Sequence, residues 1–140
     1  MDLGATLYVK NSAEALAFYL DAFGMELGYN AKNGDGTYLH AELMKDGQSI
    51  FAVSENTDEE LVQAMLKSER PTMSYGLNLD SNAELEHAFE VLSQGGHVLR
   101  ELGPLPWTPL SADLVDRYGV CWYLFVSQHR PDEEATLTDF

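Results

Sequence analysis

Two side chains that could take part in chemistry lie two positions apart in an expected strand. His40 and Glu42 point to the same face of that strand, because side chains alternate between the two faces of an extended chain. An imidazole next to a carboxylate can act as acid and base, or can supply two ligands to a metal ion. A third ligand would come from another strand, where the candidates are His97, Glu101 and Asp113. The alternative is that His40 forms a hydrogen bond within the sheet while Glu42 faces solvent.

Aromatic side chains form the second group of candidates. Seven rings lie on or near expected strands, namely Tyr8, Tyr38, Phe51, Tyr75, Trp107, Trp122 and Tyr123. All except Tyr75 are candidate ligand contacts, since rings that line a cavity suit a flat or cationic organic molecule through apolar burial and cation–π attraction. Trp107 is the strongest single candidate, because the prolines around it restrict the direction of its loop. The alternatives are that the rings belong to the core and that Trp107 closes it.

Charge limits the classes of partner. The 140 residues include 8 Lys plus Arg and 23 Asp plus Glu, which gives a formal net charge of −15. This charge repels phosphate backbones and anionic membranes, so we expect no nucleic-acid or membrane partner, and it favours a cationic ligand. The alternative is that acidity only keeps the protein soluble. No apolar stretch approaches the ~20 residues of a membrane span, and we expect a cytoplasmic protein.

One local sequence holds two further titratable groups and the single cysteine. Cys121 lies between apolar neighbours, which predicts a buried, inert thiol rather than a nucleophile. Arg117 follows Asp116 directly, and this pair is typical of an ion pair at a turn.

The chain repeats itself after 70 positions. Residues 11–14 (NSAE) and 81–84 (SNAE) follow short apolar runs, and both quartets predict capping boxes at the start of a helix. Each quartet leads into apolar residues spaced for one helix face, from Ala15 in the first half and from Leu85 in the second. A later apolar run, residues 50–54, matches residues 123–127 at a shift of 73 positions.

These signals predict an α+β fold of two tandem β-α-β-β-β modules. One domain covers residues 1–128, with modules at 1–54 and 73–128, a linker helix at 55–72 and an acidic tail at 129–140. The expected strands are 7–9, 25–31, 38–44, 49–54, 73–79, 97–102, 112–115 and 121–127. A proline-rich loop covers residues 104–109.

This order of elements resembles the vicinal oxygen chelate superfamily, which includes glyoxalase I, bleomycin-resistance proteins and extradiol dioxygenases. The resemblance spans about residues 4–127. Within it, residues 13–23, 39–43 (LHAEL) and 114–122 (LVDRYGVCW) resemble the PhnB-like proteins. The resemblance implies that the sheets curl and together form a cup, and that two chains form a homodimer.

The resemblance also implies a place for a metal, which enzymes of the superfamily hold with the first and last strands of each module. The matching positions here are Gly4, a residue near Ile50 or Phe51, Ser74 and Tyr123. None of them offers the imidazole or carboxylate that Zn²⁺, Ni²⁺ or Fe²⁺ prefers. We therefore expect neither a metal nor a cofactor, and without the metal the superfamily's chemistry lacks its Lewis acid.

The sequence thus predicts a metal-independent small-molecule binding protein of the glyoxalase and bleomycin-resistance type, which sequesters an aromatic or cationic ligand. One alternative is a metal-dependent lyase, isomerase or dioxygenase-like enzyme that uses His40 and Glu42. Another is a dimeric scaffold without a ligand. Whether the protein is an enzyme stays open at this stage.

Overall fold

The computed structural model describes residues 1–140 except 57, 70 and 129–140, so the predicted tail lies outside the described residues. The first module contains β1 (Thr6–Val9), α1 (Ser12–Phe23), β2 (Glu26–Lys32), β3 (Tyr38–Lys45) and β4 (Gln48–Glu55). The second contains β5 (Tyr75–Asn78), α3 (Asn82–Ser93), β6 (His97–Leu105), β7 (Thr108–Val115) and β8 (Cys121–Phe125). Between them lies α2 (Glu59–Lys67), which is shorter than the predicted linker helix.

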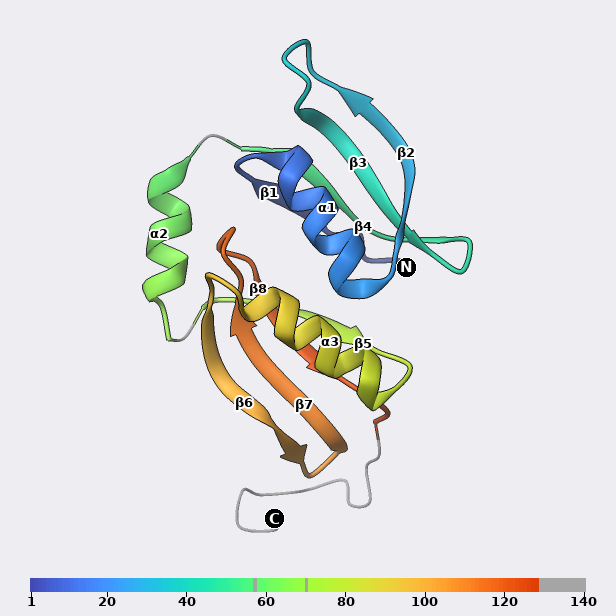
Figure 1. Ribbon diagram of the computed structural model, residues 1–140, viewed down its shortest axis with the longest axis vertical. Coiled ribbons are helices and arrows are strands. Elements are labelled where there is room, and N and C mark those ends of the chain that lie inside the picture. Colours follow the sequence, from blue (N-terminus) through green and yellow to red (C-terminus); the bar gives the residue numbers. More distant parts are fainter. Residues whose placement is uncertain (57, 70, 129–140) are drawn as a thin grey trace.

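Each module has one four-stranded mixed sheet. The strand orders are β1-β4-β3-β2 and β5-β8-β7-β6, with the first strand of each module parallel to the last and the other pairs antiparallel. Figure 1 shows the two modules one above the other, with α1 and α3 side by side and α2 at one edge. The predicted α+β fold of two β-α-β-β-β modules is confirmed.

The register of the parallel strands corrects the predicted alignment of the repeat. Leu7 pairs with Val53 in the first sheet, and Leu77 pairs with Leu124 in the second. The partner in β8 therefore lies 71 positions after its equivalent in β4, so the predicted shift of 73 is wrong. Shifts of 71 and 73 differ by two residues and so place the same side chains on the buried face, which is why the apolar pattern of β4 does not distinguish them.

The helices begin in different ways. Ser81 Oγ accepts from the Glu84 N–H at 3.1 Å, as predicted, and the Glu84 carboxylate accepts from the Asp80 N–H at 3.1 Å. At α1 the predicted capping box is wrong, because Asn11 has a left-handed backbone and its side chain caps nothing. The carboxylate of Glu55, at the end of β4, caps α1 instead.

Rings from both modules meet in the core between them. The indole of Trp122 on β8 lies 5.7 Å from the ring of Tyr19 and 5.0 Å from that of Phe23, both on α1, measured between centroids. Phe51 on β4 packs against the same indole at 5.4 Å. Edge-on and tilted packing of this kind adds to the stabilisation from apolar burial. The modules are therefore joined by one continuous aromatic core.

A single buried carboxylate organises this core. Asp116 is fully buried and accepts hydrogen bonds from Tyr19 Oη at 2.6 Å and Trp122 Nε1 at 2.8 Å. It also accepts from the backbone N–H groups of Tyr118 and Val120, at 2.9 and 3.1 Å. Burial raises the pKa of Asp116 above its ordinary value, against the opposing effect of these four donors. Asp116 thereby ties the β7–β8 turn to α1.

Arg117 does not form the predicted ion pair with Asp116, whose carboxylate points into the core. Its Nε donates to the Gln94 carbonyl at 3.1 Å, at the C-terminal end of α3. Its guanidinium lies 4.6 Å from the ring centroid of Phe18, and its Nη1 lies 3.9 Å from Glu14 Oε1. At this turn Asp116 thus points into the core, while Arg117 points toward α3 and α1.

The predicted proline-rich loop is a β-hairpin. β6 continues to Leu105 and β7 begins at Thr108, so only Pro106 and Trp107 form the turn. Pro104 lies in β6, an edge strand, where a residue without an N–H is tolerated. The hairpin places Trp107 at the end of the second sheet.

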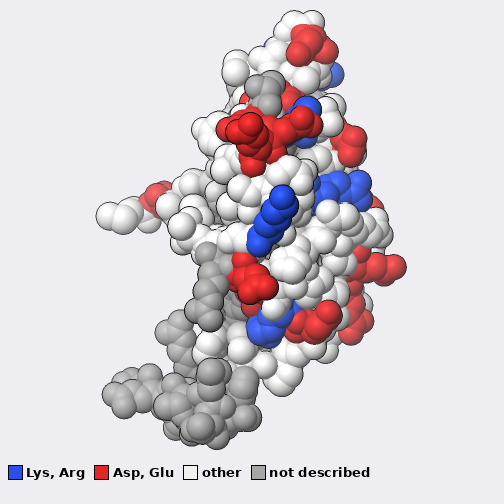
Figure 2. Space-filling model, turned by 90° about the vertical axis from the view of Figure 1, so that its left-hand side faces the viewer, with Lys and Arg blue, Asp and Glu red and all other residues white. Residues whose placement is uncertain are grey.

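Charged side chains are mixed on the face of the molecule that carries α2. Figure 2 shows groups of Asp and Glu separated there by Lys and Arg. Lys10 and Glu59 form one of the ion pairs of this region. Among the described residues no helix is long and apolar enough to cross a membrane.

Candidate functional site

The two faces of each sheet differ in what covers them. Leu7 and Val53 in the first sheet, and Leu124 and Ala112 in the second, share register on the buried face that packs against α1 and α3. Neighbouring residues in each strand point the other way. This second face is called the open face below, and it carries His40, Glu42 and Tyr123 among the predicted side chains.

On the open face of the first sheet, His40 and Glu42 contact each other. His40 Nε2 lies 3.0 Å from Glu42 Oε2, and both side chains are about one-third exposed. Hydrogen bonds from His40 and Ser49 hold the pKa of Glu42 below its ordinary value. The Tyr29 ring lies 6.2 Å from the imidazole. The pair is therefore an oriented imidazole and carboxylate, which departs from the alternative in which Glu42 only faces solvent.

On the open face of the second sheet, an arginine and a carboxylate form an ion pair. Arg100 Nε donates to Asp113 Oδ2 at 2.7 Å, and Arg100 Nη2 donates to Ser111 Oγ at 2.7 Å. A hollow of about 480 Å³ lies beside this pair, and Ser74 and Cys121 also line it. A space of this size falls in the range of small-molecule sites.

Three aromatic rings lie on the open face of the same sheet. Tyr123 stacks on Phe125 with ring centroids 4.9 Å apart, and its hydroxyl accepts from Trp107 Nε1 at 3.0 Å. Gly76 on β5 pairs with Tyr123, and a β-carbon there would touch both the Tyr123 and Phe125 rings. The missing side chain leaves these rings free on that side. We call Trp107, Tyr123 and Phe125 the aromatic group.

The internal repeat relates the two open faces. Glu42 pairs with Ala52 in the first sheet, and Asp113 pairs with Tyr123 at the equivalent place in the second. Glu42 contacts the His40 imidazole and Asp113 pairs with the Arg100 guanidinium, so each carboxylate has a partner in its own module. The two faces therefore share a frame of paired carboxylates, but only the second adds the aromatic group.

The structure divides the six predicted aromatic contacts into two sets. Trp107 is 37% exposed and Tyr8 is 64% exposed, and Tyr123 is half-buried on the open face. Trp122 and Phe51 are buried on the opposite face, where they pack around Tyr19, so they do not reach the open face. Tyr38, the sixth predicted contact, is also buried in the core. Two residues that the sequence analysis did not predict, Arg100 and Phe125, reach the open face.

The donor set does not fit the superfamily's metal. On the first and last strands of each module, the open face presents Thr6, Tyr8, Ala52, Ser54, Gly76, Asn78, Cys121, Tyr123 and Phe125. None of these side chains is an imidazole or a carboxylate. A metal site at His40 and Glu42 would need a third ligand from His97, Glu101 or Asp113. In the described part of the chain no three His, Cys, Asp or Glu side chains cluster, and Asp113 is held by Arg100.

Cys121 lies on the open face but its thiol is buried. Burial raises the pKa of this thiol to about 11. A thiol of that pKa carries almost no thiolate near neutral pH, which is the character expected of a buried, unreactive cysteine.

Comparison with known proteins agrees with this architecture. Residues 4–123 match the model of the Glyoxalase/Bleomycin resistance protein/Dioxygenase superfamily. The chain belongs to this superfamily. Among solved structures, protein PA1353 from Pseudomonas aeruginosa is similar to this chain, with 27% sequence identity and a TM-score of 0.67. The match covers 91% of this chain and 98% of PA1353.

Two further solved structures share the glyoxalase-like fold. The PhnB protein from Bacillus cereus is 24% identical with a TM-score of 0.69, and covers 91% of this chain and 100% of its own. The fosfomycin resistance protein FosX from Listeria monocytogenes, solved with Mn(II) and sulfate, is 16% identical with a TM-score of 0.61, and covers 91% and 90%. A search of curated protein sequences found no significant match.

Proposed function

We propose that this superfamily member is a metal-independent binding protein for a small, flat organic molecule, aromatic or cationic, held against the aromatic group. The observation that carries the proposal is the contact between Trp107 Nε1 and Tyr123 Oη at 3.0 Å, next to the stacked Phe125 ring. The hydrogen bond orients the indole before any ligand arrives, so binding loses less side-chain entropy. Trp107 stays partly exposed in this position.

The surroundings favour a ligand with a delocalised or positive charge. Aromatic faces attract cations, and the chain as a whole is strongly acidic. Asp113, the register partner of Tyr123 on the neighbouring strand, is already neutralised by Arg100, so the rings rather than an unpaired acid would make the main contact. An apolar planar cation matches this combination better than a compact, strongly hydrated one.

The test is a thermal-shift and titration panel of planar organic cations and their neutral isosteres. Trp107→Ala should weaken any ligand found by about tenfold, because loss of one desolvated ring contact costs ~1 to 2 kcal/mol. Leu27→Ala is the matched control, since Leu27 is an exposed apolar side chain that pairs with Leu43 on the other face. Equal loss in both variants, or no effect of Trp107→Ala on any of the ligands found, would contradict the proposal.

The contact between His40 and Glu42 favours a second candidate, an enzyme in which this pair acts as acid and base. A carboxylate that orients an imidazole is a common arrangement for proton transfer. A metal-dependent form of this candidate would require stoichiometric metal in purified protein and a melting temperature sensitive to EDTA. A panel without any ligand would favour the third candidate, a dimeric scaffold, and the homodimer itself stays a prediction for light scattering.

A further inference from the structure

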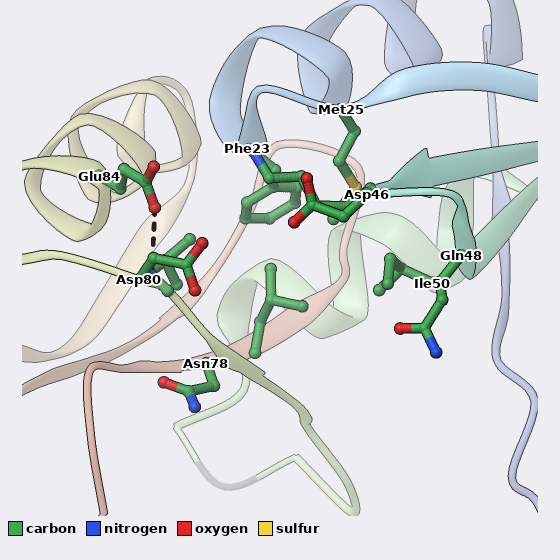
Figure 3. Close-up of a pocket in the computed structure, with 11 residues that line it drawn as sticks. Phe23, Met25, Asp46, Gln48, Ile50, Asn78, Asp80 and Glu84 are labelled. Atoms are coloured by element: carbon green, nitrogen blue, oxygen red, sulfur yellow. Dashed lines mark hydrogen bonds between the residues drawn. The ribbon is translucent and has the colours of Figure 1, made fainter.

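A second pocket lies at the junction of the modules, and none of the three rings of the aromatic group lines it. It has a volume of about 250 Å³, and its floor includes Phe23, Ile50 and Leu79. Figure 3 shows Asp46 on one side of this pocket and Asp80 with Glu84 on the other, with the Phe23 ring between them. We call it the junction pocket.

The internal repeat supplies an equivalent of this pocket at the opposite end of the junction. Lys45, beside the β3–β4 turn, donates to the Gly24 carbonyl at the end of α1 at 3.2 Å. In the second module Arg117, in the β7–β8 turn, donates to the Gln94 carbonyl at the end of α3 at 3.1 Å. Each turn therefore contacts the helix of its own module in the same way, and each faces the first turn of the other module's helix.

The two ends of the junction differ in what occupies the space next to the first turn of the helix, which is α3 at the junction pocket and α1 at the opposite end. At the opposite end, called the filled end below, Tyr118 occupies the place next to Glu14, and its hydroxyl donates to Glu14 Oε1 at 2.8 Å. A hollow of about 260 Å³ that Tyr118 also lines remains at this end, but Glu14 does not line it. Arg117 adds a guanidinium near the same carboxylate and over the Phe18 ring. Glu84 is the equivalent of Glu14, 70 positions later. At the junction pocket, no side chain of the described residues contacts Glu84 as Tyr118 contacts Glu14. The β3–β4 turn carries Asp46 there, and the pocket is open.

We propose that the junction pocket binds a small organic cation that carries a ring, and that this ligand takes the place held at the other end by Tyr118 and Arg117. At the filled end, the phenol of Tyr118 and the guanidinium of Arg117 both lie near the Glu14 carboxylate in the first turn of α1, and the guanidinium lies over the apolar Phe18 ring. At the open end three carboxylates face one lysine, whose ammonium is engaged with Gly24. The surplus negative charge selects a cation, and the apolar floor selects a ring rather than a bare ion.

Tyramine, which combines a phenol with an ammonium group, is the probe that tests this proposal by isothermal titration. Tyrosol, its neutral counterpart, should bind about tenfold more weakly or not at all, since it lacks the charge-assisted contact. Glu84→Gln and Asp46→Asn should each weaken tyramine by about threefold to tenfold, and added salt should weaken it further. Both changes preserve local structure, because Gln can serve in a capping box and Asn tolerates the positive φ of Asp46.

Two controls separate the outcomes. Glu14→Gln removes the equivalent carboxylate at the filled end and should leave tyramine affinity unchanged. Trp107→Ala should also leave it unchanged, so a failure at the junction pocket is distinct from a failure of the aromatic group. The proposal is overturned if tyramine does not bind at millimolar concentration, if tyrosol binds equally well, or if Trp107→Ala abolishes binding while Glu84→Gln does not.

Discussion

Replacement of Asp116 by alanine should lower the free energy of unfolding by about 4 kcal/mol, because it strands the partners of a buried charge. The phenol of Tyr19 and the indole of Trp122 would each keep a buried donor without an acceptor. Two backbone N–H groups of the β7–β8 turn would lose their acceptor as well. Urea denaturation followed by tryptophan fluorescence measures the change.

Tyr19→Phe is the matched control for this prediction. It removes one of the four donors but keeps the ring, so it should cost only about 1 to 1.5 kcal/mol. If Asp116→Ala costs no more than Tyr19→Phe, the carboxylate does not organise the junction as described.

The same carboxylate has a defined effect on pH dependence. Burial raises the pKa of Asp116, so the folded chain takes up this proton more readily than the unfolded chain. The stability contributed by protonation is present below the unfolded pKa and is lost as pH rises through the higher, folded pKa. Relative to Asp116→Asn, which does not titrate, the wild type should therefore gain stability as pH falls across this window.

Replacement of Glu55 by alanine should cost about 2 kcal/mol, because this side chain caps α1 from 43 and 44 positions away. Its carboxylate accepts from the backbone N–H groups of Asn11 and Ser12, at 3.1 and 2.8 Å, and from the buried Ser12 hydroxyl at 2.7 Å. That hydroxyl in turn accepts from the Tyr38 N–H at 2.8 Å, so the loss extends into β3.

Ser81→Ala provides the comparison at α3, where the cap is local. Loss of this single cap should cost about 1 kcal/mol. Circular dichroism during urea unfolding measures both variants. A smaller effect of Glu55→Ala than of Ser81→Ala would contradict the assignment of Glu55 as the cap of α1.

The repeated modules were predictable from local signals, since helix periodicity and turn residues depend on neighbours in the chain. The cap of α1 was not, because Glu55 reaches it through the parallel pairing of β1 with β4. The quartet at residues 11–14 has the composition of a capping box, yet a left-handed Asn11 leaves it unused. Tertiary contacts replaced the local rule at this position.

The candidate site was predictable only in part, for a similar reason. Trp107 and Trp122 look alike in sequence, but the register of β8 turns Trp122 toward Asp116 and the β6–β7 hairpin leaves Trp107 partly exposed. Arg100 carried one signal, a charge inside an apolar strand pattern, and the pairing of β6 with β7 was needed to place it beside Asp113. Face assignment depends on register, which the sequence alone does not specify.

The two indole N–H groups offer the most direct test of the central claim, that the aromatic group binds a planar organic ligand. Trp107 and Trp122 are the two tryptophans of the chain, one bound to Tyr123 on the open face and one to buried Asp116. In ¹H–¹⁵N NMR spectra, titration with a ligand from the panel should shift the Trp107 indole signal and leave that of Trp122 in place. If ligands of the panel bind and none of them moves the Trp107 signal, the account is contradicted.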